Sequence, residues 1–169
     1  EIAFEYFKYD SDYEPVGFAV EKEFLSKTQL FGLPVVPLEN LEEEFPSAEH
    51  EVFIATTYTA LNTLRERLFR QLKSRGYKLA SYISSHAFVW RNVKVGENCF
   101  IFEDNTIQPF SIIEENCILW SGNHIGHHSI IRKNSFIASQ VVISGGVEIG
   151  SNTFVGVNAT IRDHIKIGK

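Results

Sequence analysis

Three of the six histidines in this 169-residue chain, His124, His127 and His128, stand within five positions. An imidazole titrates near neutral pH, so such a residue can act as a general base, and several together can bind a transition metal. Histidines also occur in polar turns, where they are only solvated. Which of these applies depends on the elements that position the three side chains.

A six-residue repeat runs through the second half of the chain. Fifteen consecutive aliphatic residues recur at that spacing, from Ile83 to Ile167. The third residue after each of them is mostly Asn, Asp or Gly, which tolerate the left-handed backbone of a tight corner. The repeat predicts a left-handed parallel β-helix, in which three hexads make one triangular coil. Residues 18 apart should then stack about 4.8 Å apart, the spacing of paired strands.

This stacking rule predicts an outward column and an inward pair. The outward column is apolar, and because so long an apolar column rarely faces water, it should pack against a partner prism or the N-terminal half. Its members are Phe100, Ile118, Phe136 and Phe154. The inward pair is Cys99 over Cys117, which we expect to be reduced thiols rather than a disulfide.

The same register separates the three histidines. His124 should point outward from a flat face, His127 should project from a corner, and His128 should hold the turn position. Gly145 follows His127 by 18 residues and precedes Gly146, so the imidazole of His127 should stand beside a corner without side chains. A thioester could approach the backbone there, and its carbonyl oxygen could accept a hydrogen bond from an N–H. This arrangement favours His127 as a general base, with solvated turn residues as the alternative.

Residues 1–80 show a different pattern, in which strands and helices alternate. A helical spacing opens the chain, and apolar runs predict strands at Pro15–Val20, Val35–Val36 and Glu51–Thr56. A long helix should follow, with one apolar face and Gly76 as its left-handed stop. That face consists of Leu61, Leu64, Leu68 and Leu72. This order predicts a small α/β unit with a parallel sheet, whose ligand site should lie at Thr56–Thr59, the carboxyl end of a strand.

Composition limits the partners. The net charge is -5 and no run of Lys or Arg is present, which argues against a nucleic-acid backbone or an anionic membrane as partner. No apolar stretch approaches the roughly 20 residues that span a bilayer. We therefore expect a cytoplasmic protein that binds a small molecule or another protein. Because the chain lacks Met and stops partway through a corner, we also expect a piece of a longer protein.

Three segments carry a specific resemblance to known enzymes. They are RGYKLASYISSHA near the junction of the two halves, IGHHSII at the histidine corner, and VVISGGVEIGSNTFVGVNATI after it. From about residue 75 to 169 the chain resembles the bacterial sugar acetyltransferases that join a small nucleotide-sugar-binding α/β domain to a left-handed β-helix. This family includes nucleotide-aminosugar N-acetyltransferases and sialic acid O-acetyltransferases. Residues 1 to about 74 are also similar to it but begin after its first strand and glycine-rich turn.

The resemblance implies two domains and an acetyl-CoA site. Residues 1–80 would be a partial, Rossmann-like nucleotide-sugar-binding domain, and residues 81–169 a left-handed β-helix that is truncated. His127 matches the base that takes a proton from a sugar amine or hydroxyl, and His128 matches a position that is usually Asp or Glu. Gly145, with Gly146, would meet the thioester oxygen, and Val157 would line the path of the pantetheine arm. Such enzymes are trimers with the cofactor between neighbouring prisms, and the reaction uses no metal.

The acceptor side of the site is implied less directly. Glu21 and Lys22 stand where the family often has acidic residues near the nucleotide, and Arg65 matches a basic position. The alternative for these charges is ordinary solvated surface. Trp120 and Phe136 replace the Asn and His of the family, so the acceptor pocket should be reshaped. Asn123 is also expected to bind the substrate.

The resulting hypothesis is an acetyl-CoA-dependent N-acetyltransferase that acts on a nucleotide-linked amino sugar for a bacterial surface glycan. One alternative is O-acetylation by the same family. Another is a zinc carbonic anhydrase built on the same prism, but His86, His124 and His127 or His128 do not repeat the expected five-residue spacing between two of its ligands. A third alternative is a trimer that only binds a sugar nucleotide, since a fold alone does not fix a function.

Overall fold

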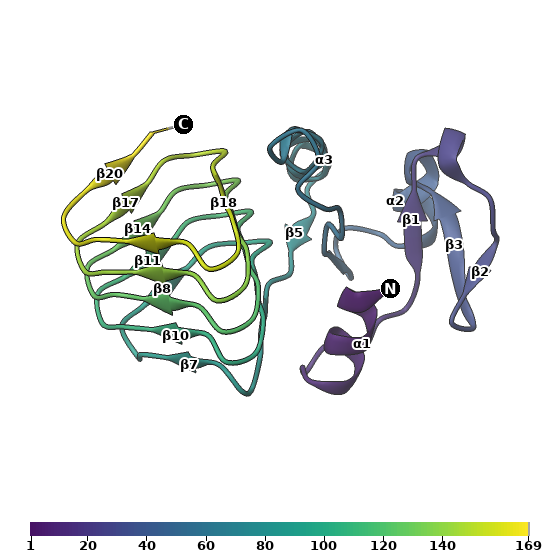
Figure 1. The fold of residues 1–169 in the computed structure, drawn as a ribbon. Helices are drawn as coiled ribbons and strands as arrows, with labels where there is room; N and C mark the ends of the chain where they lie inside the picture. The colour runs from purple at the N-terminus through teal and green to yellow at the C-terminus, as the bar shows by residue number, and fades with distance from the viewer. Residues whose placement is uncertain (169) are drawn as a thin grey trace.

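The C-terminal half of the chain is a triangular prism of stacked parallel strands (Figure 1). The computed structural model describes residues 1–168. Each short strand pairs in parallel with the strand 18 residues further on, so that Thr106 lies beside His124 and Ile118 beside Phe136. This register confirms the stacking rule, and the arrangement matches the parallel β-helix that the six-residue period predicts.

The strands of the prism form three faces. The first face contains β6 (Tyr82–Ile83), β9 (Phe100–Ile101), β12 (Ile118–Leu119), β15 (Phe136–Ile137) and β18 (Phe154–Val155). The second face contains β7 (Phe88–Val89), β10 (Thr106–Ile107), β13 (His124–Ile125), β16 (Val142–Ile143) and β19 (Thr160–Ile161). The third face contains β8 (Lys94–Val95), β11 (Ile112–Ile113), β14 (Ile130–Ile131), β17 (Glu148–Ile149) and β20 (Lys166–Ile167).

Inside the prism, the aliphatic residue of each hexad forms the core. Ile107, Ile125 and Ile143 are fully buried one above another, as the repeat requires. Cys99 and Cys117 are also fully buried and are free thiols, as expected. The corners use residues with left-handed backbone, chiefly asparagines, and His128 is one of them with φ 57°. The inward side chains and the tight corners together define the prism.

The N-terminal half consists of short elements. They are α1 (Ile2–Tyr9), β1 (Phe18–Val20), η1 (Lys22–Phe24), β2 (Gln29–Leu30), β3 (Leu33–Pro37), η2 (Leu38–Asn40), α2 (Leu41–Glu44), β4 (Glu51–Val52), α3 (Thr63–Ser74) and β5 (Lys78–Leu79). The expected helices and strands are thus present, but β1 and β4 are shorter than expected and β3 is longer. No helix in the described part of the chain is long and apolar enough to cross a membrane.

Three expectations for the N-terminal half need correction. The strands do not form one parallel sheet: β1 pairs in parallel with β3, β2 pairs antiparallel with β3, and β4 pairs only with β5 among the described residues. The strand expected at Glu51–Thr56 ends at Val52, because the N–H of Ile54 donates to the side chain of Asn98 instead of a neighbouring strand. Leu61 is not part of the helical face, because Ala60, Leu61 and Asn62 have left-handed backbone and α3 begins after them.

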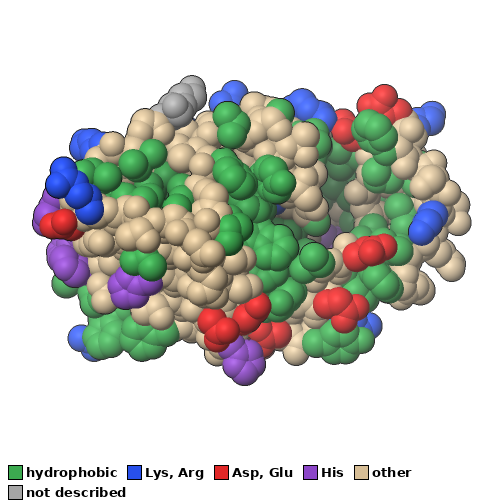
Figure 2. All heavy atoms as spheres, in the orientation of Figure 1, with side chains coloured by type: hydrophobic (Ala, Val, Ile, Leu, Met, Phe, Trp, Pro, Cys, Tyr) green, Lys and Arg blue, Asp and Glu red, His purple; other side chains and the backbone are tan. Residues whose placement is uncertain are grey.

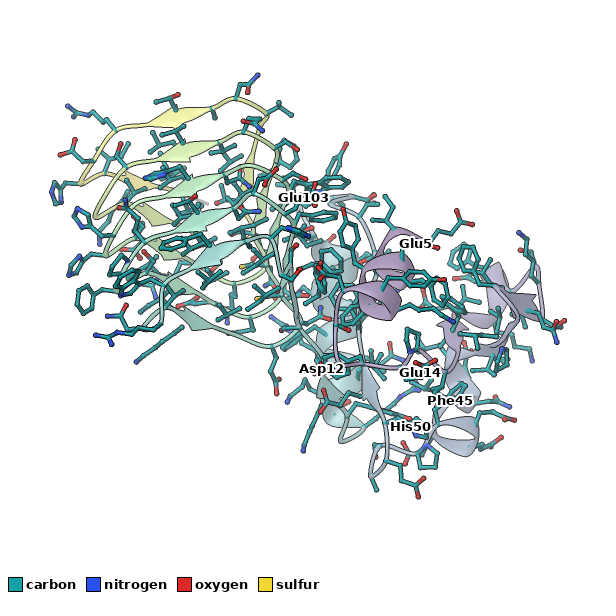
Figure 3. All side chains as sticks on the ribbon, turned by 90° about the horizontal axis from the view of Figure 1, so that it is seen from below. Glu5, Asp12, Glu14, Phe45, His50 and Glu103 are labelled. Carbon is teal, nitrogen blue, oxygen red and sulfur yellow. The ribbon has the colours of Figure 1, made fainter. Side chains whose placement is uncertain are left out.

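The N-terminal half covers the first face of the prism. The outward apolar column therefore packs against this half of the chain. Tyr82, Phe100 and Phe136 on that face are buried against residues of α1 and the segment after β4. Phe154, at the far end of the column, stays 40% exposed. At the junction, Glu103 accepts a 2.9 Å hydrogen bond from the hydroxyl of Tyr6 in α1. Figure 3 shows Glu103 on the side of the prism next to α1.

A seam of hydrogen bonds joins the N-terminal half to the corner between the third and first faces. The guanidinium of Arg65 donates to the carbonyl of Asn98 at 2.7 Å. Asn62 donates to the carbonyl of Asn134 at 2.7 Å, and Asn152 donates to the carboxylate of Glu66 at 3.0 Å. Because these contacts span several coils, α3 is fixed along the length of the prism.

Candidate functional site

His127 and His128 lie on the corner between β13 and β14, where the second and third faces meet. The backbone N–H of His127 donates to Oε1 of Gln108 at 3.0 Å, and that of His128 donates to the carbonyl of Pro109 at 3.1 Å. Both side chains are exposed. The corner therefore holds the backbone of both residues to the coil below and leaves their rings accessible.

Gly145 stands beside the ring of His127, as the stacking rule predicts. A Cβ on Gly145 would lie 2.8 Å from Cε1 and 2.9 Å from Nε2 of His127. The N–H of Gly145 has no hydrogen-bond partner among residues 1–168, whereas the N–H of Gly146 donates to the carbonyl of His127 at 2.9 Å. The corner thus offers one free backbone donor, at Gly145, close to the imidazole.

The two rings of the histidine pair contact each other. Their Nδ1 atoms are 3.1 Å apart, and the rings are almost perpendicular, at 87°. On its other side, His128 stacks on Phe110, with ring centroids 4.7 Å apart. Within residues 1–168, no Asp or Glu forms an ion pair with either ring. The ring of His127 therefore contacts another imidazole, and neither ring is paired with an acid in the described part of the chain.

The structure does not bring the third histidine into this pair. His124 lies on the second face in β13, beside Thr106 and Val142 of the neighbouring strands. No group of three or more His, Cys, Asp or Glu side chains that could hold a metal ion is found in the described part of the chain. The sequence cluster is thus a pair of corner residues plus one residue on a face.

A cavity of about 570 Å³ lies between the N-terminal half and the first face of the prism. Its walls are largely aromatic: Tyr58 contacts Phe136 and Phe154 with centroid distances of 5.0 and 4.9 Å, and Trp120 stacks on Phe102 at 4.5 Å. We call this the junction cavity. Figure 2 shows hydrophobic side chains gathered where the two halves meet.

Arg65 is the basic residue on the wall of the junction cavity. Its guanidinium is fully buried, donates to the carbonyls of Ile54 and Asn98, and lies over the ring of Phe53. Burial lowers the pKa of Arg65 to about 10, so the group remains a cation at neutral pH. Nε of Arg65 and Oγ1 of Thr56 are buried without a partner among residues 1–168. Unpaired buried polar atoms at a cavity wall are available to a ligand.

Only some of the other residues expected to bind the acceptor line the junction cavity. Trp120 and Val157 line the junction cavity, as do Thr56 and Thr57 from the expected ligand site. Glu21 lies elsewhere, paired with Arg67 at 2.8 Å, and the N–H of Lys22 next to it donates to Glu39 at 3.2 Å.

Asn123 is not in the cavity wall. It is inside the prism, 1% exposed, with its amide bonded to the backbone of Trp120 and Val141. Its side chain therefore has no remaining surface to offer a substrate, contrary to the expectation for this residue.

The histidine pair and the junction cavity lie on opposite sides of the prism. The cavity covers the first face, whereas the corner of His127 joins the other two faces. Figure 2 shows histidine side chains on the outer edge of the prism, away from the N-terminal half. Within one chain, a ligand in the cavity therefore does not meet the imidazole of His127.

Known proteins support the fold. The family model described as "Bacterial transferase hexapeptide (six repeats)" matches residues 110–145 and 128–163. The acetyltransferase domain of PglB from Neisseria gonorrhoeae FA1090 is similar in structure, with a TM-score of 0.81, 19% identity, and coverage of 93% of this chain and 74% of that chain. No curated protein matches the chain by sequence.

Two further solved structures are similar. PerB from Caulobacter crescentus, in complex with CoA and GDP-perosamine, has a TM-score of 0.76 at 24% identity, covering 85% of this chain and 68% of that chain. WeeI from Acinetobacter baumannii AYE has a TM-score of 0.52 at 20% identity, covering 98% and 80%. At these identities the likeness establishes the shared fold alone.

Proposed function

We propose that this protein is an acetyl-CoA-dependent acetyltransferase that acts on the amine of a nucleotide-linked sugar, in the cytoplasm and for a bacterial surface glycan. The observation that carries the proposal is the imidazole of His127 beside the free N–H of Gly145 on a hexapeptide prism. Two similar structures support the choice of ligands: PerB was solved with CoA and GDP-perosamine, and the PglB domain with acetyl coenzyme A.

In the proposed reaction, Nε2 of His127 takes a proton from the sugar amine as its nitrogen attacks the thioester carbon. The N–H of Gly145, with the side-chain-free corner of Gly146 beside it, would donate to the thioester oxygen as negative charge develops there. When the carbon–sulfur bond breaks, the imidazolium of His127 returns the proton to the CoA thiolate. The amide and free CoA are the products, and His127 ends neutral. His128 is the proposed partner of His127 in a catalytic pair.

The junction cavity is the proposed acceptor site. Its buried guanidinium, Arg65, carries a positive charge without a carboxylate partner among residues 1–168, which suits the diphosphate of a nucleotide sugar. Trp120 gives the cavity a flat apolar wall for the sugar or base. Val157, 65% exposed at the cavity edge, remains the proposed contact for the pantetheine arm. Glu21, Lys22 and Asn123 receive no support from their positions.

The proposed domains follow from the same division. Residues 1–80 would bind the nucleotide sugar, and residues 81–169 would form the left-handed transferase prism. A Rossmann-like sheet needs one more strand between β1 and β4, each of which is a terminal strand of its sheet. A second cavity of about 390 Å³ is lined by both strands and by Leu64, Leu68 and Leu72 of α3, and an extended strand would fill it.

A homotrimer is part of the proposal because one chain cannot combine the two sites. The base of one prism would face the junction cavity of its neighbour. Two inactive variants test this arrangement: His127→Ala lacks the base, and Ser139→Trp fills the cavity that Ser139 lines. Mixed trimers should regain activity, because one interface then keeps both an intact base and an intact cavity. Mixtures no more active than their components would refute shared sites.

The reaction itself is tested by free-thiol release from acetyl-CoA with nucleotide-linked 4-amino sugars as acceptors. His127→Ala should lower kcat by roughly 10²-fold or more, the usual contribution of a general base. His86→Ala is the matched control, because His86 is an exposed histidine of the first coil. Full activity of a folded His127→Ala variant would exclude the base, and thiol release only with hydroxyl sugars would mean O-acetylation.

A further inference from the structure

The contact between His127 and His128 is made by two atoms of the same kind. Nδ1 of each ring lies 3.1 Å from Nδ1 of the other. A neutral imidazole has one N–H and one bare nitrogen, so this contact is a hydrogen bond only when one Nδ1 carries the proton and the other does not. The pair must therefore adopt opposite tautomers.

We propose that His127 donates its Nδ1–H to the bare Nδ1 of His128, which leaves Nε2 of His127 free to take the proton of the acceptor amine. His128 is then a positioning residue in a histidine pair that works without a carboxylate. This inference rests on the proposed transferase function. It extends that function by naming the protonation state in which the site works: both rings neutral, with one proton held between them.

The surroundings hold both rings in this geometry. A Cβ on Gly145 would meet Cε1, Nε2 and Nδ1 of His127 at 2.8, 2.9 and 3.2 Å, so the ring lies against this glycine. Nδ1 is the nitrogen that contacts His128. His128 is fixed by its left-handed backbone, by its N–H bond to Pro109 and by the stack on Phe110. Because both rings are held from separate sides, neither needs to rotate when the proton arrives.

The proton balance of the reaction is unchanged by the pair. When Nε2 of His127 takes the amine proton, the ring becomes an imidazolium and its bond to Nδ1 of His128 becomes charge-assisted, hence stronger. The imidazolium then loses the same proton to the CoA thiolate. A second proton on the pair would place two N–H groups against each other and break the bond. A single proton on Nε2 of His127 before the amine binds already blocks the base, so the site works only when both rings are neutral.

Few other titratable groups face the pair. The coil below presents the amide of Gln108 and the ring of Phe110, and the coil above presents Gly145 and Gly146. Beyond Gly146 lies His164, whose ring packs against that glycine and is 3.9 Å from the carboxylate of Asp163. Asp163 and His164 thus stand at this corner one coil further on, and Gly145 and Gly146 lie between them and the histidine pair.

Three substitutions of His128 test the pair while keeping its backbone. Asn, Asp and Gly all tolerate the left-handed conformation, with φ 57° here. His128→Gly removes the acceptor and should lower kcat roughly ten-fold, a part of the 10²–10⁴ that a general base supplies, with KM for acetyl-CoA unchanged. His128→Asn restores an acceptor atom at the same place and should recover activity to within about three-fold of wild type by the same reasoning.

The third variant tests the charge of the partner. His128→Asp places a carboxylate beside His127, which holds the imidazolium more firmly than a neutral ring does. The acid limb of the kcat/KM profile should therefore move to higher pH than in wild type, whereas His128→Asn should leave it near or below the wild-type position. Wild-type kcat in His128→Gly, or the same low kcat in His128→Asn, would overturn the proposal.

A spectroscopic measurement separates the pair from the reaction. In ¹⁵N NMR spectra of the free protein above the acid limb, His127 should carry its proton on Nδ1 and His128 on Nε2, and His128→Gly should leave His127 as a mixture of tautomers. If acetyl-CoA transfers to no sugar, the proposed function fails while these spectra still decide the pair. A His127 ring protonated on Nε2 in the neutral protein would exclude the assignment.

Discussion

Gly145 and His127 are in contact across neighbouring coils, with room for a ring but not for a methyl group. A Cβ on Gly145 would lie 2.8 Å from Cε1 of His127. Because Gly145 does not have left-handed backbone, Gly145→Ala should fold normally and displace the imidazole instead. We expect kcat/KM to fall by roughly 10- to 100-fold, since small misplacements of a reacting group are costly.

The matched control for this prediction is Gly156→Ala. A Cβ there meets only one atom, in the ring of Phe154 at 4.0 Å, which is ordinary contact. Both variants should keep a thermal midpoint close to that of the wild type, measured by circular dichroism. An active Gly145→Ala variant would show that the ring can move without consequence.

A ladder of asparagine side chains fixes the corner between the third and first faces. Nδ2 of Asn98 donates to Oδ1 of Asn116 at 2.6 Å, and Nδ2 of Asn116 donates to Oδ1 of Asn134 at 2.7 Å. Asn116→Ala would leave a donor and an acceptor unpaired in a buried place, which costs about 2 kcal/mol of unfolding free energy. It would also place alanine in left-handed backbone, and this strain lowers the unfolding free energy as well. The cost of the strain must therefore be subtracted from the total loss.

Asn158→Ala supplies that correction. Asn158 has φ 59°, close to the 64° of Asn116, but its side chain is exposed. In urea denaturation, Asn116→Ala should lose about 2 kcal/mol more unfolding free energy than Asn158→Ala. This difference is the contribution of the ladder bonds. Equal losses in the two variants would mean that the ladder bonds contribute nothing.

The prism could be predicted from the sequence because each hexad encodes its own geometry. Ile125 points inward and His128 takes left-handed backbone for reasons that are local, and the period then places Gly145 beside His127. The burial of Asn123 could also have been predicted, because it holds the small inward position of its hexad. That inward position argues against a role of Asn123 in substrate binding.

The N-terminal half could be predicted only in part, because long-range contacts decide its details. The strand expected at Glu51–Thr56 is short because Ile54 bonds to Asn98, and the helix expected to include Leu61 begins after Asn62, which bonds to Asn134. No local pattern reveals a partner more than 40 residues away. The junction cavity has the same origin, since its walls come from both halves of the chain.

The inward thiol of Cys117 should be replaceable by serine. Sγ of Cys117 lies 3.2 Å from the carbonyl oxygen of Arg132, and Oγ of Ser129 and Ser135 donate to the carbonyl 15 residues further on at 3.0 Å. Cys117→Ser can make the same bond and should change the unfolding free energy by less than about 1 kcal/mol, whereas Cys117→Ala should lose about 1–2 kcal/mol.

Alkylation provides a second measurement on this thiol. Cys117 is fully buried, and burial raises its pKa, so iodoacetamide should not modify it in the native protein. Modification should begin only at urea concentrations that unfold the prism. Rapid labelling of the native protein would show that the prism opens more readily than its packing suggests.

Asp10 ties the end of α1 to the first coil of the prism, and its contribution should depend on pH. Hydrogen bonds from Ser85 and Tyr82 lower the pKa of Asp10 to about 2. An unfolded aspartate titrates near 3.9, so the folded value is the lower one. The ionised carboxylate therefore stabilises the fold above about pH 4, and this contribution is lost as the pH falls from about 4 toward 2.

Asp10→Asn should lower the urea midpoint at pH 7, and the difference from wild type should shrink toward pH 2. Asp12→Asn, an exposed neighbour, should leave the midpoint unchanged at pH 7, and an Asp10→Asn deficit that is constant with pH would contradict the assignment.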